Sequence, residues 1–348
     1  MPEPGDGADE RPRTSSKRSP LGMLRRVPTP IVFAVAIAIA IGVLWHRGAI
    51  DDVRTAISEA DRTTLLTGLI LYPAALALLC FRWHVLVRMI HGASHAPRAS
   101  EAFLTSVALN YTAPVSVASA SRALLTKRAL GLSATETSAV ALWEVAADVG
   151  VLGLGGAAWL VFSGEGADVL AALPGNAFIA AGVLVAVLLL GALVAVAFIR
   201  RRPRLQERLQ FAALTILTSP SKRPALAFAA VAISVLYWFM QGVVLWTLLR
   251  AVTGESDPML ALGFVTLPVV LGMLSGLPGG AGIREALMVA VADAYGANPS
   301  EALVAAVTYR IALFAAIPIL YGAVRIWLMA DPGPQSHGTM LTAPGDPE

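Results

Sequence analysis

Long apolar segments constrain this chain more than any other feature of its sequence. We expect six membrane-spanning helices, at residues 31–45, 65–87, 134–162, 177–199, 225–249 and 300–328. A helix needs roughly 20 predominantly apolar residues to cross a bilayer, and most of these segments reach that length. The composition agrees, with 56% hydrophobic residues, 14% charged residues and a mean hydropathy of +0.69. The sequence therefore predicts an all-α polytopic membrane protein.

Two further apolar stretches are too short for a comfortable crossing. Within residues 101–130, two short arms meet at residues 110–114, and after Asp257 two more arms meet at residues 277–285. Irregular backbone survives at membrane depth only where it is buried in protein or lines a cavity. We therefore predict two re-entrant helical hairpins in addition to the six spans. Eight full crossings fit the same sequence.

The two short-armed regions resemble each other at an offset of 165 residues. The aligned pairs are Leu109 with Leu274, Gly131 with Gly296, and Glu136 with Glu301. Three spans separate the two regions, so the second hairpin should enter from the face opposite the first. Inverted repeats with broken helices are a transporter architecture. Chance similarity between Ala- and Gly-rich segments is the alternative.

Basic residues predict the orientation, because lysine and arginine gather in cytoplasmic loops. Residues 1–30 are expected to be a disordered cytoplasmic tail, and residues 329–348 a polar cytoplasmic tail. Of 26 basic residues, 20 then lie inside. The four outside are Arg47, Arg54, Arg62 and Arg250, and the two within the membrane are Arg284 and Arg310. Arg82, His84 and Arg88 are expected to reach the headgroups at the cytoplasmic end of the second span.

The break at residues 277–285 is the best candidate site. Pro278 stops the preceding helix, and Gly279, Gly280 and Gly282 allow a ligand to approach the backbone. A new helix can begin at residue 283 and run to residue 294, and its first N–H groups would attract an anion. Arg284 strengthens that preference, whereas Glu285 can neutralise it or carry a proton.

Other charges also lie within the apolar segments. Glu144 and Asp148 stand four residues apart on one helix face, Arg310 lies near the middle of the last span, and Arg122 belongs to the first hairpin. These residues either neutralise one another and lock the bundle together, or they line a polar cavity for an anionic headgroup. In the second case Glu144, Asp148 and Glu285 would set the polarity of the cavity or couple protons.

The chain resembles the flippase-like transmembrane domain of lysylphosphatidylglycerol synthases and its stand-alone relatives over residues 31–328. The resemblance is carried by residues 278–285, 110–114, 131–132 and 144–148, together with Arg122. Residues 114–119 read Pro-Val-Ser-Val-Ala-Ser where the family tends to show Pro-Gly-Arg-Leu-Gly-Glu, and Glu144 is followed by Val145 where the family shows Glu-Arg. The resemblance implies the translocating part without the aminoacyl-transfer domain.

We therefore expect a protein of the bacterial plasma membrane that moves an anionic phospholipid or a lipid-linked phosphate between leaflets. The expected substrate-binding residues are Asn110, Arg122, Gly279, Gly280, Gly282, Arg284, Glu285 and Arg310. The alternative is a membrane enzyme or accessory subunit acting on polyprenyl-linked sugars, with the carboxylates as acid and base.

No catalytic motif, cofactor motif or nucleic-acid-binding signal is found in the sequence. Cys80 is the only cysteine, which excludes an intramolecular disulfide and a cysteine-based metal cluster. His84, His91 and His95 do not have the spacing of a zinc site. We expect neither a metal nor another cofactor.

Overall fold

A computed structural model describes residues 58, 60–110, 115–164, 213–214, 216–254, 256–274, 280 and 283–332. All regular structure in this part of the chain is helical. The predicted spans at 31–45 and 177–199 and the predicted N-terminal tail lie outside the described residues.

Four helices in the described part are long and apolar enough to cross a membrane. They are α4 (Arg62–His91), α7 (Ala134–Phe162), α11 (Pro224–Thr253) and α14 (Pro299–Ala330). These helices confirm the segments predicted at 65–87, 134–162, 225–249 and 300–328, and α7 has the predicted bounds. Large apolar side chains such as Leu154 and Phe228 are exposed on their outer faces, as expected for contact with lipid.

Local sequence signals account for where these helices begin and end. Ser133 and Glu136 form a reciprocal capping box at the start of α7, and the Asn298 side chain accepts from the backbone N–H of Ser300 at the start of α14. Gly92 and Gly254 follow α4 and α11 with φ of 97° and 79°, a region that favours glycine.

Two pairs of shorter helices precede α7 and α14. The first pair is α5 (Ala96–Asn110) and α6 (Val115–Leu130), and the second is α12 (Pro258–Leu274) and α13 (Ile283–Ala294). The order of a helix pair, a glycine and a long helix therefore occurs twice. Gly131 and Gly296 occupy equivalent places, are 165 residues apart and have φ of 71° and 68°. The starts of α7 and α14 are also 165 residues apart.

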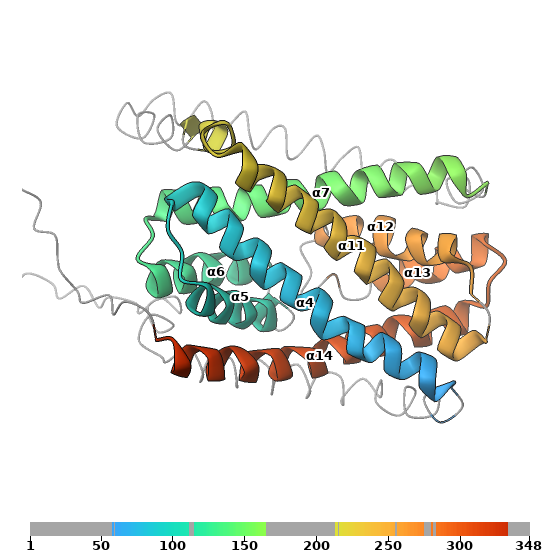
Figure 1. Ribbon diagram of the computed structural model, residues 1–348. Coiled ribbons are helices and arrows are strands. Elements are labelled where there is room, and N and C mark those ends of the chain that lie inside the picture. Colours follow the sequence, from blue (N-terminus) through green and yellow to red (C-terminus); the bar gives the residue numbers. More distant parts are fainter. Residues whose placement is uncertain are drawn as a thin grey trace, which may run out of the picture.

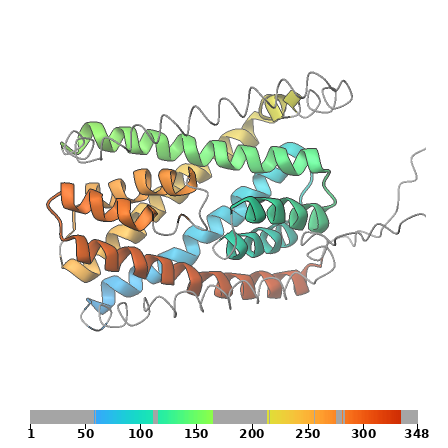
Figure 2. The ribbon, with the colours of Figure 1, turned by 180° about the vertical axis from the view of Figure 1, so that it is seen from behind.

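The two pairs lie at opposite ends of the bundle (Figure 1), and the view from behind shows the same separation (Figure 2). In the N-terminal half of α7, Glu144 bonds Arg122 of α6, whereas in its C-terminal half a Cβ on Gly156 would lie 3.1 Å from Leu267 of α12. Near the end of α14, Arg325 donates to Glu101 of α5 at 2.8 Å.

Helices α4 and α11 run side by side in opposite directions through the middle of the bundle (Figure 1). At one end the Asp61 backbone N–H donates to the Ala251 carbonyl oxygen at 3.1 Å. At the other end Arg223 donates to the carbonyl oxygens of Arg88 and Met89, each at 2.8 Å. Between these ends Gly68 lets the helices approach closely, because a Cβ there would lie 2.7 Å from the Thr247 hydroxyl. This central pair carries polar side chains toward both ends of the bundle.

The opposite placement of the helix pairs predicts opposite accessibility of their connections to α7 and α14. In a Cys80→Ser background, Lys127→Cys and Ser300→Cys each supply one exposed thiol. Ser300 is chosen in preference to Gly296, because a side chain at the Gly296 φ of 68° would be strained. An impermeant thiol reagent added outside intact cells should label Ser300→Cys, and label Lys127→Cys only after the membrane is opened. Labelling of both from the same side would contradict this topology.

Candidate functional site

The structure divides most of the predicted site residues between two polar clusters. The first cluster contains Arg82, Ser106, Arg122, Glu144, Asp148, Ser234 and Trp238. The second contains Gln241, Gly280, Arg284, Glu285, Tyr309 and Arg310. Gly279 and Gly282 lie outside the described residues. Asn110 ends α5, and no described contact links it to either cluster.

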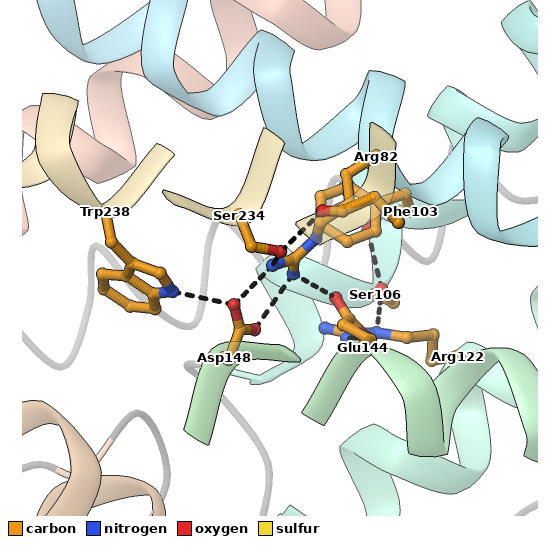
Figure 3. A network of polar contacts seen from close by, with 9 residues as sticks. Arg82, Phe103, Ser106, Arg122, Glu144, Asp148, Ser234 and Trp238 are labelled. Carbon is orange, nitrogen blue, oxygen red and sulfur yellow. Dashed lines mark hydrogen bonds and ion pairs between the residues drawn. The ribbon is translucent and has the colours of Figure 1, made fainter. Parts of the chain in front are cut away.

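Arg82 is the centre of the first cluster (Figure 3). Its side chain is only 1% exposed and donates to both carboxylates of α7. One guanidinium nitrogen bonds Asp148 Oδ1 and, at 3.0 Å, Ser234 Oγ of α11. The other bonds Asp148 Oδ2 at 3.0 Å and Glu144 Oε1 at 3.2 Å. The two acids therefore share a helix face, as their spacing predicted, and both are ion-paired to α4.

Arg122 attaches the first helix pair to this cluster. It donates to Glu144 Oε2 and, through Nε, to Ser106 Oγ at 2.8 Å (Figure 3). Its guanidinium lies over the rings of Trp83 and Phe103, 5.7 and 5.2 Å from their centroids. This arginine of α6 therefore contacts residues of α4, α5 and α7.

The expectation that Arg82 reaches the headgroups is wrong. The end of α4 that carries Arg82 is enclosed by α5, α7 and α11, and the acids of α7 face it across this contact. Arg88, two turns further on, is exposed. The sequence signal for this buried ion pairing was the presence of two acids in one apolar span, because a buried carboxylate needs a cation nearby. The sequence did not show which of several arginines would supply it.

The first cluster is electrically neutral and its carboxylates are fully bonded. Two cations face two anions, and each of the four carboxylate oxygens accepts at least one hydrogen bond. Asp148 Oδ1 also accepts from Trp238 Nε1 at 2.8 Å. For Glu144 and Asp148 this geometry favours the interpretation that the charges lock the helices together.

The second cluster joins α13 to α14, and α14 in turn to α11. Glu285 Oε1 and Arg310 Nη2 are 2.6 Å apart, and both side chains are 16% exposed. The Arg284 guanidinium lies 4.8 Å from the centre of the Tyr309 ring. The Tyr309 hydroxyl donates to Gln241 Oε1 of α11 at 2.6 Å. The predicted residues Arg284, Glu285 and Arg310 are therefore brought together, whereas Tyr309 and Gln241 were missed.

Glycines pack the predicted break against the end of α12. Gly280 has a φ of 68°, and a Cβ on it would lie only 2.9 Å from the Cα of Gly272. A Cβ on Gly272 would in turn lie 3.5 Å from the Cβ of Arg284. Glycine is required at position 280 both by its backbone conformation and by this close approach.

The second cluster carries a surplus positive charge. Among the described residues of this cluster, Arg284 and Arg310 are two cations and Glu285 is one anion, and residues 277–282 of the break contain no charged side chain in the sequence. The arrangement can therefore compensate one negative charge on a ligand. No group of three or more His, Cys, Asp or Glu side chains in the described part of the chain is placed to hold a metal ion.

The two clusters contain related ion pairs with exchanged signs. In the first, a cation on α6 meets an anion on α7, namely Arg122 and Glu144. In the second, an anion on α13 meets a cation on α14, namely Glu285 and Arg310. At the offset of 165, Glu144 corresponds to the residue next to Arg310. Each helix pair is thus attached to the long helix that follows it.

Comparison with protein families matches most of the chain. The family described as the lysylphosphatidylglycerol synthase TM region matches residues 31–322, a range that contains both clusters. No curated protein matches the chain.

Arg82→Ala should destabilise the protein strongly, because it leaves two buried carboxylates without their shared cation. Breaking a buried ion pair by removing one partner costs about 3–5 kcal/mol. Folded yield and unfolding temperature in detergent would measure the loss. Arg88→Ala removes an exposed arginine from the same helix and should behave like the unaltered protein. Equal unfolding temperatures for the two variants would contradict the central role of Arg82.

Proposed function

We propose that this chain, which belongs to the lysylphosphatidylglycerol synthase TM region family, moves an anionic phospholipid or a lipid-linked phosphate between membrane leaflets. The observation that carries the proposal is the surplus positive charge of the second cluster, beside a glycine-rich break in a multi-pass membrane protein.

The described side chains of the second cluster sum to one net positive charge, and because net charge at membrane depth is unfavourable, the cluster favours an anionic ligand. The first N–H groups of α13 have no partner within their own helix, and the positive end of the helix attracts the same ligand. Phosphate suits such a site because it accepts charge-assisted hydrogen bonds from guanidinium and backbone donors together.

The residues of the second cluster take different roles in this proposal. Arg284 contacts the phosphate together with the first N–H groups of α13. Arg310 is held by Glu285, so a phosphate that competes with this carboxylate can draw Arg310 into the site. Arg122 is assigned to the neutral first cluster and is no longer a phosphate ligand in this scheme.

The two helix pairs support a transport mechanism through their placement. We propose that they are re-entrant hairpins of an inverted repeat, entering from opposite faces of a bacterial plasma membrane with both termini in the cytoplasm. Breaking the ion pair that joins each helix pair to α7 or α14 would loosen that contact and let the pair move against its long helix. Opening at alternate ends would expose the second cluster to one leaflet and then to the other.

Arg284→Ala should weaken binding of an anionic lipid by about tenfold or more, through loss of a charge-assisted contact worth roughly 1.5–3 kcal/mol. The fold should survive. The measurement is binding and transfer of fluorescent phosphatidylglycerol in liposomes, at lipid concentrations that limit the rate. Arg250→Ala is a matched control, because Arg250 also stacks on an aromatic ring, Trp246, but lies at the end of α11.

Folded Arg284→Ala protein that binds and transfers the lipid at the unaltered rate would remove the anion-site proposal. The glycine-rich break would then be a packing device, and a role as an accessory subunit for polyprenyl-linked sugars would gain support.

Glu285→Gln should tighten binding of the anionic lipid several-fold, because it removes the carboxylate that, among the described residues of the cluster, offsets the charge of Arg284 and Arg310. Transfer should slow, since a more tightly held lipid leaves the site less readily. Transfer rates across a pH range would also show whether Glu285 carries a proton, because the variant would then lose a pH dependence seen in the unaltered protein. Weaker binding by well-folded Glu285→Gln would contradict the charge argument.

A further inference from the structure

We infer that Tyr309 and Gln241 are positioning residues that hold the Arg284 guanidinium in place for an anionic headgroup. The inference rests on the function proposed above for the second cluster, and assigns residues of α14 and α11 to it. Neither residue is charged, and neither belongs to the glycine-rich break.

The three side chains form one continuous series of contacts across three helices. Gln241 is fully buried on α11 and accepts from the Tyr309 hydroxyl at 2.6 Å. Tyr309 is 5% exposed on α14, and its ring lies 4.8 Å from the Arg284 guanidinium of α13. Tyr72 of α4 packs edge-on against the same ring, with centroids 5.1 Å apart. Packing on one side and a hydrogen bond at the tip therefore fix the ring on which Arg284 rests.

A stacked arginine suits phosphate binding better than a mobile one. Stacking on an aromatic ring uses the face of the guanidinium, whereas its N–H groups point outward in the plane and form the fork that matches phosphate. Holding the side chain in one orientation before the ligand arrives also lowers the conformational entropy lost on binding. An aromatic ring at position 309 thus contributes to affinity without touching the ligand.

Gln241 is a poor choice for stability alone. It lies within a spanning helix next to fully buried apolar residues such as Val244 and Leu245. In the described part of the chain its Nε2 has no hydrogen-bond partner, so the bond to Tyr309 satisfies only one end of the amide. A buried amide with an unpaired donor is destabilising, and leucine of similar size would avoid that cost. A buried polar side chain that lowers stability, placed beside a charged cluster, indicates a functional role at this position.

The test compares three variants in detergent solution, using binding of fluorescent short-chain phosphatidylglycerol and the unfolding temperature. Tyr309→Leu removes the ring and should weaken binding by about tenfold. Tyr309→Phe keeps the ring but loses the bond to Gln241, and should weaken binding by about threefold. Gln241→Leu should weaken binding to a similar extent while its unfolding temperature stays level or rises.

Tyr321→Phe is the matched control. It removes a tyrosine hydroxyl from the same helix, where that hydroxyl donates to Glu101 at 3.2 Å near the far end of α14. Its binding should equal that of the unaltered protein.

A stabilised or unchanged Gln241→Leu protein that binds less lipid is a result that a purely structural glutamine does not produce. The inference is overturned if Tyr309→Leu and Gln241→Leu bind like the unaltered protein while Arg284→Ala binds less, a result that leaves the anion site itself intact. It is also overturned if Gln241→Leu lowers the unfolding temperature and the Tyr321→Phe control loses as much lipid binding as Gln241→Leu does. Unaltered binding by Arg284→Ala is the separate result that removes the proposed function.

Discussion

A cation in a bilayer is stable only beside an anion, and the contact of Arg82 with Glu144 and Asp148 meets that requirement where several helices converge. The three side chains belong to α4 and α7. Ser234 and Trp238 of α11 bond to this group, and Arg122 of the first helix pair bonds to Glu144. Because its charges balance and all four carboxylate oxygens accept hydrogen bonds, this cluster can be buried without a ligand. The orientation of α4, and through it of α11, depends on this balance.

The second cluster contains a similar ion pair between two helices but has a different net charge. One ion pair again attaches a short helix to the long helix after it, but the two arginines here share one described carboxylate, whereas the first cluster has two carboxylates for two arginines. At the offset of 165 residues, Arg284 and Glu285 correspond to Ser119 and Ala120. The first helix pair therefore has no equivalent of the charged break. The same order of helices thus occurs with a neutral cluster at one end of the bundle and a positively charged cluster at the other.

This division also explains where the chain departs from the family pattern. The polar motif expected after Pro114 is replaced by small uncharged residues, in the half where the structure finds a closed ion network. The half that keeps the motif, residues 278–285, holds the surplus charge. Tyr309 and Gln241 extend that site toward the centre of the bundle, where α11 meets α14. In the proposed transport cycle the first half supplies a stable frame and the second binds the lipid.

The sequence by itself determined the described helices and their order. Apolar length, caps and glycines act within a few residues, so the bounds of α7 and α13 and the spacing of 165 residues could be predicted before any contact was known. Only the tertiary structure decided the pairing of charges, which depends on how each helix is rotated against neighbours distant in the chain. Arg82 meets Asp148 across 66 residues and Tyr309 meets Gln241 across 68, and neither contact leaves a local pattern.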